Sequence, residues 1–145
     1  MGPGAPPRGR PDHYRARRGP RPHTEFGRDD AHLDARLRLL RTEDGRHWDA
    51  LLMRPREPAP GREDTLVIVA HGSMGGYLTG VPRRVAFVLA QHGLAALSIN
   101  TRMANYGTVY GSGLLDETLL DVDAALVEAR ALGYTRVVLL GHSLG

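Results

Sequence analysis

The segment RVVLLGHSLG, Arg136 to Gly145, carries the strongest indication of the fold. Its first half is a short apolar run typical of a buried β-strand, and its second half has the pattern G-x-S-x-G around Ser143. A serine on a sharp strand-to-helix turn has an exposed hydroxyl and a strained backbone, and side chains at Gly141 and Gly145 would collide with neighbouring backbone. Alone, the pattern also fits an ordinary glycine-rich turn. Its place directly after the strand favours a nucleophile elbow with Ser143 as the nucleophile.

A second glycine-rich loop, HGSMGG at residues 71–76, follows an earlier apolar run. When a serine attacks an ester carbonyl, the carbonyl oxygen gains negative charge and needs two preorganised backbone N–H donors. One donor comes from the residue after the nucleophile, and the other comes from the loop after an earlier strand. We therefore expect an oxyanion hole formed by the amides of Leu144 and Ser73, with Met74 as the alternative to Ser73.

His71 and Gly72 are expected to support this loop, the glycine by allowing a close approach and the imidazole by packing into a tight turn. Glycines between a strand and a helix also occur in dinucleotide sites, which need G-x-G-x-x-G and an acidic residue about 20 residues further on. Here Met74 occupies the second glycine position, and Asn100 lies where the acidic residue is expected. The sequence therefore disfavours dinucleotide binding.

The sequence predicts a β-hairpin at the N-terminal end of the domain. Residues Leu33, Ala35, Leu37 and Leu39 alternate with polar residues at period two, which predicts a half-buried strand with these side chains inside. The turn signal EDGR at 43–46 follows, and HWDALLMRP at 47–55 predicts the returning strand. Two antiparallel strands are therefore expected first.

Strand and helix patterns then alternate to the end of the chain. Apolar runs predict parallel strands at 66–70, 94–99 and 137–140, because short continuous runs of this kind are typical of strands in sheets covered on both faces. Two helices are predicted between them, with Val85, Val88 and Leu89 on the buried face of the first and Leu115, Leu119, Val122, Leu126 and Ala129 on that of the second. This order predicts an α/β fold with an antiparallel hairpin, parallel strands and helices on both faces.

Residues 33–145 resemble the first half of an α/β-hydrolase, with its initial hairpin, its HG oxyanion loop and its GHSLG elbow. The resemblance implies a serine hydrolase that acts on a small-molecule ester or amide, most often a carboxylic ester, through an acyl-enzyme on Ser143 and without a cofactor or metal. It makes His142 the variable position of the elbow. Serine peptidase, thioesterase and acyltransferase activities remain open, as does a non-catalytic binding or receptor domain on the same fold.

One loop departs from the family pattern. Many members carry D-x-R-G-x-G-x-S after the strand that corresponds to 94–99, whereas this chain has INTRMANYGTVYGSG from Ile99 onward. Arg102 is expected to be the retained arginine. The different loop leaves the acyl and leaving groups of the substrate open.

The acid and the histidine of the triad follow the serine in this fold, and only two residues follow Ser143. No upstream histidine has a spacing that points to the elbow, and His71 is the least implausible substitute. We therefore expect a truncated product of a longer coding sequence that is inactive alone. We also expect the strand at 137–140 to be an exposed apolar edge that promotes self-association.

Composition separates residues 1–31 from the rest of the chain. They hold seven Arg against four acidic residues and six of the ten prolines, which predicts a disordered Arg/Pro/Gly-rich tail before a domain at 32–145. An arginine-rich tail can bind nucleic acid, but a solvated extension is the simpler interpretation, so no nucleic-acid partner is expected.

The remaining expectations concern location and bound groups. No apolar run is long enough to span a bilayer and no apolar leader is present, so we expect no membrane partner and a cytoplasmic protein. The sequence has no cysteine, which excludes disulfides and thiolate metal sites, and no metal-ligand cluster is expected.

Overall fold

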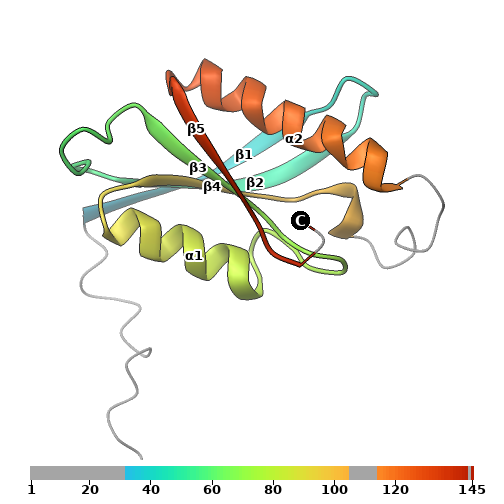
Figure 1. The fold of residues 1–145 in the computed structure, drawn as a ribbon, viewed down its shortest axis with the longest axis horizontal. Helices are drawn as coiled ribbons and strands as arrows, with labels where there is room; N and C mark the ends of the chain where they lie inside the picture. The colour runs from blue at the N-terminus through green and yellow to red at the C-terminus, as the bar shows by residue number, and fades with distance from the viewer. Residues whose placement is uncertain (1–31, 105–113, 144) are drawn as a thin grey trace, which may run out of the picture.

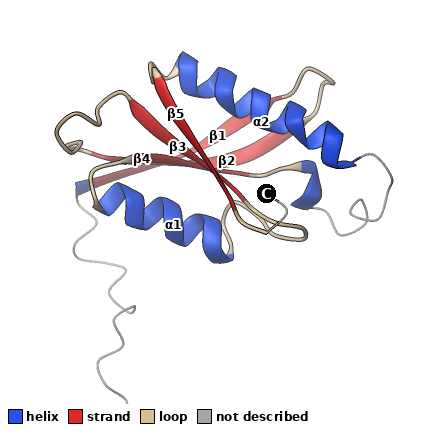
Figure 2. Cartoon of the chain, viewed as in Figure 1, coloured by secondary structure: helices blue, strands red, loops and turns tan. Residues whose placement is uncertain are grey.

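A computed structural model describes residues 32–104, 114–143 and 145. These residues form a five-stranded sheet with a helix on each face (Figures 1 and 2). The strands are β1 (Leu33–Arg41), β2 (His47–Pro55), β3 (Thr65–Ala70), β4 (Ala95–Ile99) and β5 (Arg136–Gly141). The helices are α1 (Gly80–Gln91), α2 (Leu114–Ala131) and a short 3-10 helix, η2 (Arg102–Ala104). The predicted tail at 1–31 lies outside the described residues.

The strands lie in the order β1-β2-β4-β3-β5. Strand β2 is antiparallel to both β1 and β4, whereas β3 is parallel to β4 and to β5. The predicted hairpin and parallel strands are therefore confirmed. Ala70 at the end of β3 pairs with Ile99 of β4 and with Gly141 of β5, so the loops that follow these three strands leave from the same edge of the sheet.

A layer of small side chains joins each helix to the sheet. On one face, Ala125 and Ala129 of α2 pack with Ile68 in the larger core cluster. On the other face, Ala86 of α1 packs with Val69. Figure 1 shows the two helices on opposite sides of the sheet. The prediction of helices on both faces is confirmed, and it explains why the middle of β3 is buried throughout.

The predicted buried face of β1 is wrong. Leu37 and Leu39 are 66% and 53% exposed, whereas Leu40 on the opposite face is 1% exposed. Leu40 packs into the core cluster on the α2 side, and Trp48 of β2 packs against the same cluster. The alternating pattern predicts the strand, but it does not determine which face is buried. Both faces of β1 carry leucine, and only the α2 side is covered there.

The predicted helix faces are confirmed in part. Ala129 of α2 is fully buried, and Val85 and Leu89 of α1 pack against the core cluster on their side of the sheet.

Two predicted positions on these faces are wrong. Leu119 of α2 is 65% exposed and Val88 of α1 is 49% exposed, although both were expected inside; the side chain of Leu115 lies outside the described residues. The helices instead bury small residues such as Ala86, and α2 turns Asp121 inward. Alanine lets a helix approach the sheet closely, and the buried aspartate has an arginine partner described below.

Strand β5 pairs with β3 on one side and forms an edge of the sheet in the described part of the chain. Its Val138 and Leu139 side chains are 50% and 57% exposed, which confirms the expected apolar edge. Among the described residues, none of the helices has the length and apolar character needed to cross a membrane.

Candidate active site

Ser143 occupies the turn that directly follows β5. Its φ is 61°, in the left-handed region that a residue with a side chain rarely adopts, and the residue is exposed. Its hydroxyl has no hydrogen-bond partner among the described residues. A strained backbone that presents an exposed hydroxyl is the arrangement that the G-x-S-x-G spacing predicts.

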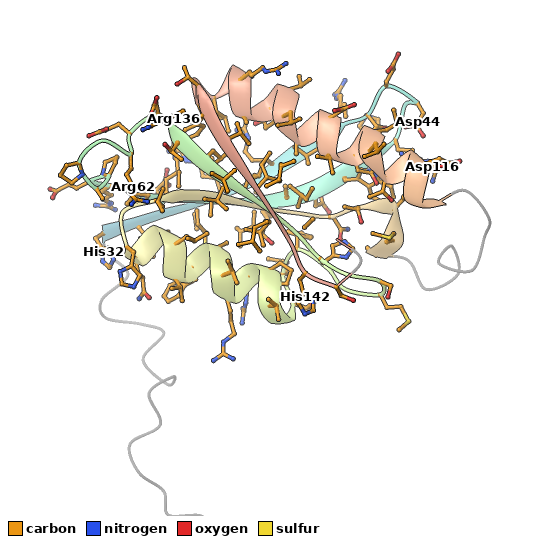
Figure 3. The ribbon with its side chains drawn as sticks, viewed as in Figure 1. His32, Asp44, Arg62, Asp116, Arg136 and His142 are labelled. Atoms are coloured by element: carbon orange, nitrogen blue, oxygen red, sulfur yellow. The ribbon has the colours of Figure 1, made fainter. Side chains whose placement is uncertain are left out.

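The loop after β3 meets this turn at the same edge of the sheet. The His142 N–H donates to the Ala70 carbonyl at 3.2 Å, and Figure 3 shows His142 at the end of β5. A Cβ built on Gly72 would lie 2.6 Å from the Cβ of Ser143 and 3.2 Å from its Oγ. Such a separation leaves no room for a side chain at residue 72, so the HGSMGG loop and the serine turn are in direct contact.

The two glycines that flank the serine are needed for the same reason. A Cβ on Gly145 would lie 2.5 Å from the His71 carbonyl oxygen and 2.8 Å from that of Ala70. A Cβ on Gly141 would overlap the Gly145 carbonyl. The backbone of the turn folds back on itself and onto the end of β3, which is the collision that the sequence predicts for larger residues.

The His71 side chain is buried, only 1% exposed, and it supports the loop through hydrogen bonds at both of its ring nitrogens. The Thr101 backbone N–H donates to Nε2 at 3.1 Å, and the Thr101 hydroxyl lies 3.2 Å from the same nitrogen. Since Nε2 accepts a hydrogen bond, the proton is assigned to Nδ1, which donates to the Gly72 carbonyl at 2.6 Å. The imidazole is thus engaged in the loop and is not a substitute base for Ser143.

The two candidate oxyanion donors on the loop differ in what their amides contact. The Met74 N–H donates to the Met103 carbonyl at 3.0 Å, and Met74 has a φ of 60°. The Ser73 N–H has no hydrogen-bond partner among the described residues. Ser73 therefore has the free donor, whereas the donor of Met74 is occupied. Leu144, the other predicted donor, lies outside the described residues.

A cluster of charges is centred on the buried residues Arg102 and Asp121. Arg102, only 1% exposed, directs Nη2 to Asp121 Oδ1 at 2.9 Å and Nη1 to Glu117 Oε2 at 2.8 Å and to Asp44 Oδ2 at 3.2 Å. Asp121, fully buried, also accepts hydrogen bonds from the Arg102 backbone N–H at 2.9 Å and from Trp48 Nε1 at 2.8 Å. The cluster links the β1–β2 turn, the segment after β4 and helix α2.

The cluster shifts the pKa values of its members. Hydrogen bonding to Asp121 raises the pKa of the Arg102 guanidinium above its ordinary value, against the opposing effect of burial, and Glu117 and Asp44 add to the rise. The pKa of the Asp44 carboxyl lies below its ordinary value, chiefly because the Thr42 hydroxyl donates to it and then because of Arg102. These charged forms are therefore the stable ones at neutral pH.

Sequence reasoning missed three residues that contact the loop or its support: Thr101, Met103 and Asp121. The first two follow β4 at the carboxyl edge of the sheet, where loops of parallel strands meet, and this position is the signal that points to them. Nothing in the helical pattern of α2 marks Asp121, because its partner Arg102 lies 19 residues away in the sequence.

Other features of the described residues lie away from this edge. Two cavities, of about 490 and 330 Å³, both contact Pro55 and Arg56 at the end of β2, and neither is lined by a residue of the HGSMGG loop or the serine turn. In Figure 3, Arg62 and Arg136 lie toward this end of the molecule, and Asp44 lies toward the other end. Within residues 32–104, 114–143 and 145, no group of three His, Asp or Glu side chains could hold a metal ion.

No protein family model matches the sequence, and no curated protein sequence matches it. Solved structures do match. The chain is similar to the Pyrococcus furiosus esterase Pf2001, with 18% identity and a TM-score of 0.63 over 78% of this chain and 44% of that one. It is similar to brefeldin A esterase, a bacterial homologue of human hormone sensitive lipase, with 26% identity and a TM-score of 0.60 over 79% and 32% of the two chains.

A bacterial heroin esterase matches with 16% identity and a TM-score of 0.58 over 77% of this chain and 35% of that one. The chain thus spans less than half the length of each of these three proteins. The strand order and the two helices agree with the similarity to these solved structures. The described residues have the fold of the N-terminal half of an α/β-hydrolase.

Proposed function

We propose that these residues are the N-terminal part of a serine hydrolase that cleaves carboxylic esters, with Ser143 as the nucleophile. The observation that carries the proposal is the contact between Gly72 and Ser143, which aligns a strained, exposed serine with a loop that carries a free amide. The structural neighbours are esterases, which supports an ester as the substrate class.

In the proposed reaction the Ser143 oxygen bonds to the ester carbonyl carbon while a histidine removes the hydroxyl proton. The carbonyl oxygen becomes an oxyanion, which accepts hydrogen bonds from the Ser73 and Leu144 amides. The alkoxide then leaves with the proton from the histidine, and water hydrolyses the acyl-enzyme. We assign the histidine and its orienting carboxylate to sequence C-terminal to Ser143 in the complete protein, because this is their order in the fold.

Hydrolysis of p-nitrophenyl acetate by the complete protein tests the proposal. We expect Ser143→Ala to lower kcat by at least about 1,000-fold, because the acyl-enzyme cannot form. Ser73→Ala is the matched control: it removes a hydroxyl from the same site but keeps the backbone N–H, so activity should stay close to that of the unmodified protein. Activity that persists in Ser143→Ala would refute the assignment, and an inactive complete protein that still binds esters would favour a binding domain.

A further inference from the structure

We infer that the buried Arg102–Asp121 ion pair positions the HGSMGG loop, so that the Ser73 amide faces the reacting oxygen. Both residues lie outside the loop, and none of the hydrogen bonds and ion pairs described for them above joins Ser143. They are positioning residues for the reaction proposed above, on which this inference rests.

The first link joins helix α2 to the segment after β4. Asp121 accepts three hydrogen bonds from Arg102: from the backbone N–H at 2.9 Å, from Nη2 at 2.9 Å and from Nε at 3.1 Å. Trp48 Nε1 donates a fourth at 2.8 Å. Both partners of the pair are almost completely buried, so loss of the Asp121 charge would leave Arg102 with only the more exposed carboxylates of Glu117 and Asp44. The pair therefore fixes the backbone of residue 102 against the helix.

The second link joins residues on either side of Arg102 to the loop. The Thr101 N–H donates to His71 Nε2 at 3.1 Å, and His71 in turn donates to the Gly72 carbonyl at 2.6 Å. The Met103 carbonyl accepts from the Met74 N–H at 3.0 Å. These bonds hold the two peptides that flank Ser73. The positions of Thr101 and Met103 in turn depend on Arg102, which lies between them in the sequence.

The direction of the Ser73 amide is sensitive to this support. Met74 has a φ of 60°, an unfavourable conformation that persists only where surrounding contacts enforce it. If the Met103 carbonyl moves, Met74 can return to an ordinary φ, and the peptide between Ser73 and Met74 turns. The Ser73 N–H belongs to the preceding peptide, which the hydrogen bond from His71 to the Gly72 carbonyl holds, so a shift of Thr101 and His71 turns this amide directly. An amide misplaced by about 1 Å can cost about 100-fold in rate.

Amide hydrogen exchange in the complete protein tests the inference without relying on catalysis. Asp121→Asn removes the charge of the acceptor, and we expect it to accelerate exchange of the Met74 and Thr101 amides by at least about tenfold relative to the Leu97 amide of the central strand. Glu128→Gln is the matched control. It removes another α2 ion pair, with Arg38 Nη2 at 2.5 Å, that does not contact residues 101–103.

Uniform acceleration of all amides in Asp121→Asn, or no acceleration at Met74, would overturn the inference, because the pair would then act on stability alone. If Asp121→Asn does not fold, Trp48→Phe decides the question. It keeps both charges and removes only the indole donor to Asp121, so the same two amides should exchange faster to a smaller extent. Unchanged exchange at both amides in a folded Trp48→Phe variant would overturn the inference.

Activity provides a second readout. In Asp121→Asn we expect kcat for p-nitrophenyl acetate to fall about 10- to 100-fold with KM nearly unchanged, because the oxyanion hole acts on the transition state. Glu128→Gln should leave both constants near those of the unmodified protein. The exchange result holds whether or not Ser143 is catalytic, so failure of this inference and failure of the proposed function are distinguishable.

Discussion

Gly72 faces Ser143 so closely that a Cβ on the glycine would lie 2.6 Å from the serine Cβ. The two residues are 71 positions apart in the sequence and belong to loops after β3 and β5. Adjacent parallel strands bring these loops together because their carboxyl ends lie at one edge of the sheet. The contact makes the glycine at residue 72 a requirement of the site.

Substitution of this glycine tests the contact. Gly72→Ala would place a methyl group within 2.6 Å of Ser143 and 2.8 Å of the His142 carbonyl, so we expect it to lower the free energy of unfolding by about 1–3 kcal/mol and to reduce ester hydrolysis. Gly76→Ala is the matched control in the same loop, because its Cβ meets nothing closer than 3.6 Å. Equal effects of the two substitutions in urea unfolding would contradict the described contact.

The hydrogen bonds of the buried His71 imidazole give a second prediction. His71→Ala leaves the Thr101 N–H and the Gly72 carbonyl without their buried partner, and we expect the free energy of unfolding to fall by about 1–3 kcal/mol. His92→Ala removes an exposed imidazole at the end of α1 and should change the free energy by less than about 0.5 kcal/mol. Urea unfolding of both variants measures the difference. A His71→Ala variant as stable as His92→Ala would show that the hydrogen bonds of His71 do not stabilise the fold.

Asp44 gives a pH dependence whose sign follows from its lowered pKa. A carboxyl whose pKa is below 3.8 in the folded protein stabilises the fold above that pH, and the contribution is lost as the pH falls through the lowered folded value. We expect Asp44→Asn to be less stable than the unmodified protein at pH 7, and the difference to shrink below about pH 4.

Urea unfolding between about pH 2 and pH 7 measures this difference. The control is Glu43→Gln, which changes the adjacent exposed carboxylate and should have a stability at pH 7 close to that of the unmodified protein. A difference between Asp44→Asn and the unmodified protein that grows on acidification would reverse the predicted sign.

The β5 edge predicts self-association of the 145-residue chain. Val138 and Leu139 are about half exposed on a strand that has one edge unpaired in the part of the chain that the structure describes, and such an edge is a template for pairing with another chain. Sedimentation velocity at increasing concentration should show oligomers, and Leu139→Lys should shift them toward monomer. Leu37→Lys changes an exposed leucine of β1 at the other edge and should leave the oligomers in place; dissociation by Leu37→Lys alone would place the contact at β1.

The sequence predicts much of the fold because the apolar runs and the turn residues agree. The runs at 66–70, 94–99 and 137–140 each differ by one residue or less at either end from β3, β4 and β5. Which face of an element is buried is less predictable. Leu37 and Leu40 are equally apolar, and only the placement of α2 over one side of β1 decides between them.

For the site, the sequence predicts the two loops but not what holds them. The glycines of both motifs report close backbone contacts, and the structure has those contacts at Gly72 and Gly145. The buried pair Arg102–Asp121 is invisible to hydrophobic patterning, because a charged residue on a helix reads as solvent-exposed until its partner is placed in space. The difference between the Ser73 and Met74 amides likewise depends on Met103, which no local pattern connects to the loop.

Mass-spectrometric mapping of a fluorophosphonate adduct on the complete protein determines whether Ser143 is an activated nucleophile, as we claim. The probe phosphonylates a serine only where a base and an oxyanion hole activate it. We predict a single adduct on Ser143 that disappears in Ser143→Ala and persists in Ser73→Ala. An adduct on another residue, or labelling of Ser143→Ala at the level of the unmodified protein, would contradict the claim.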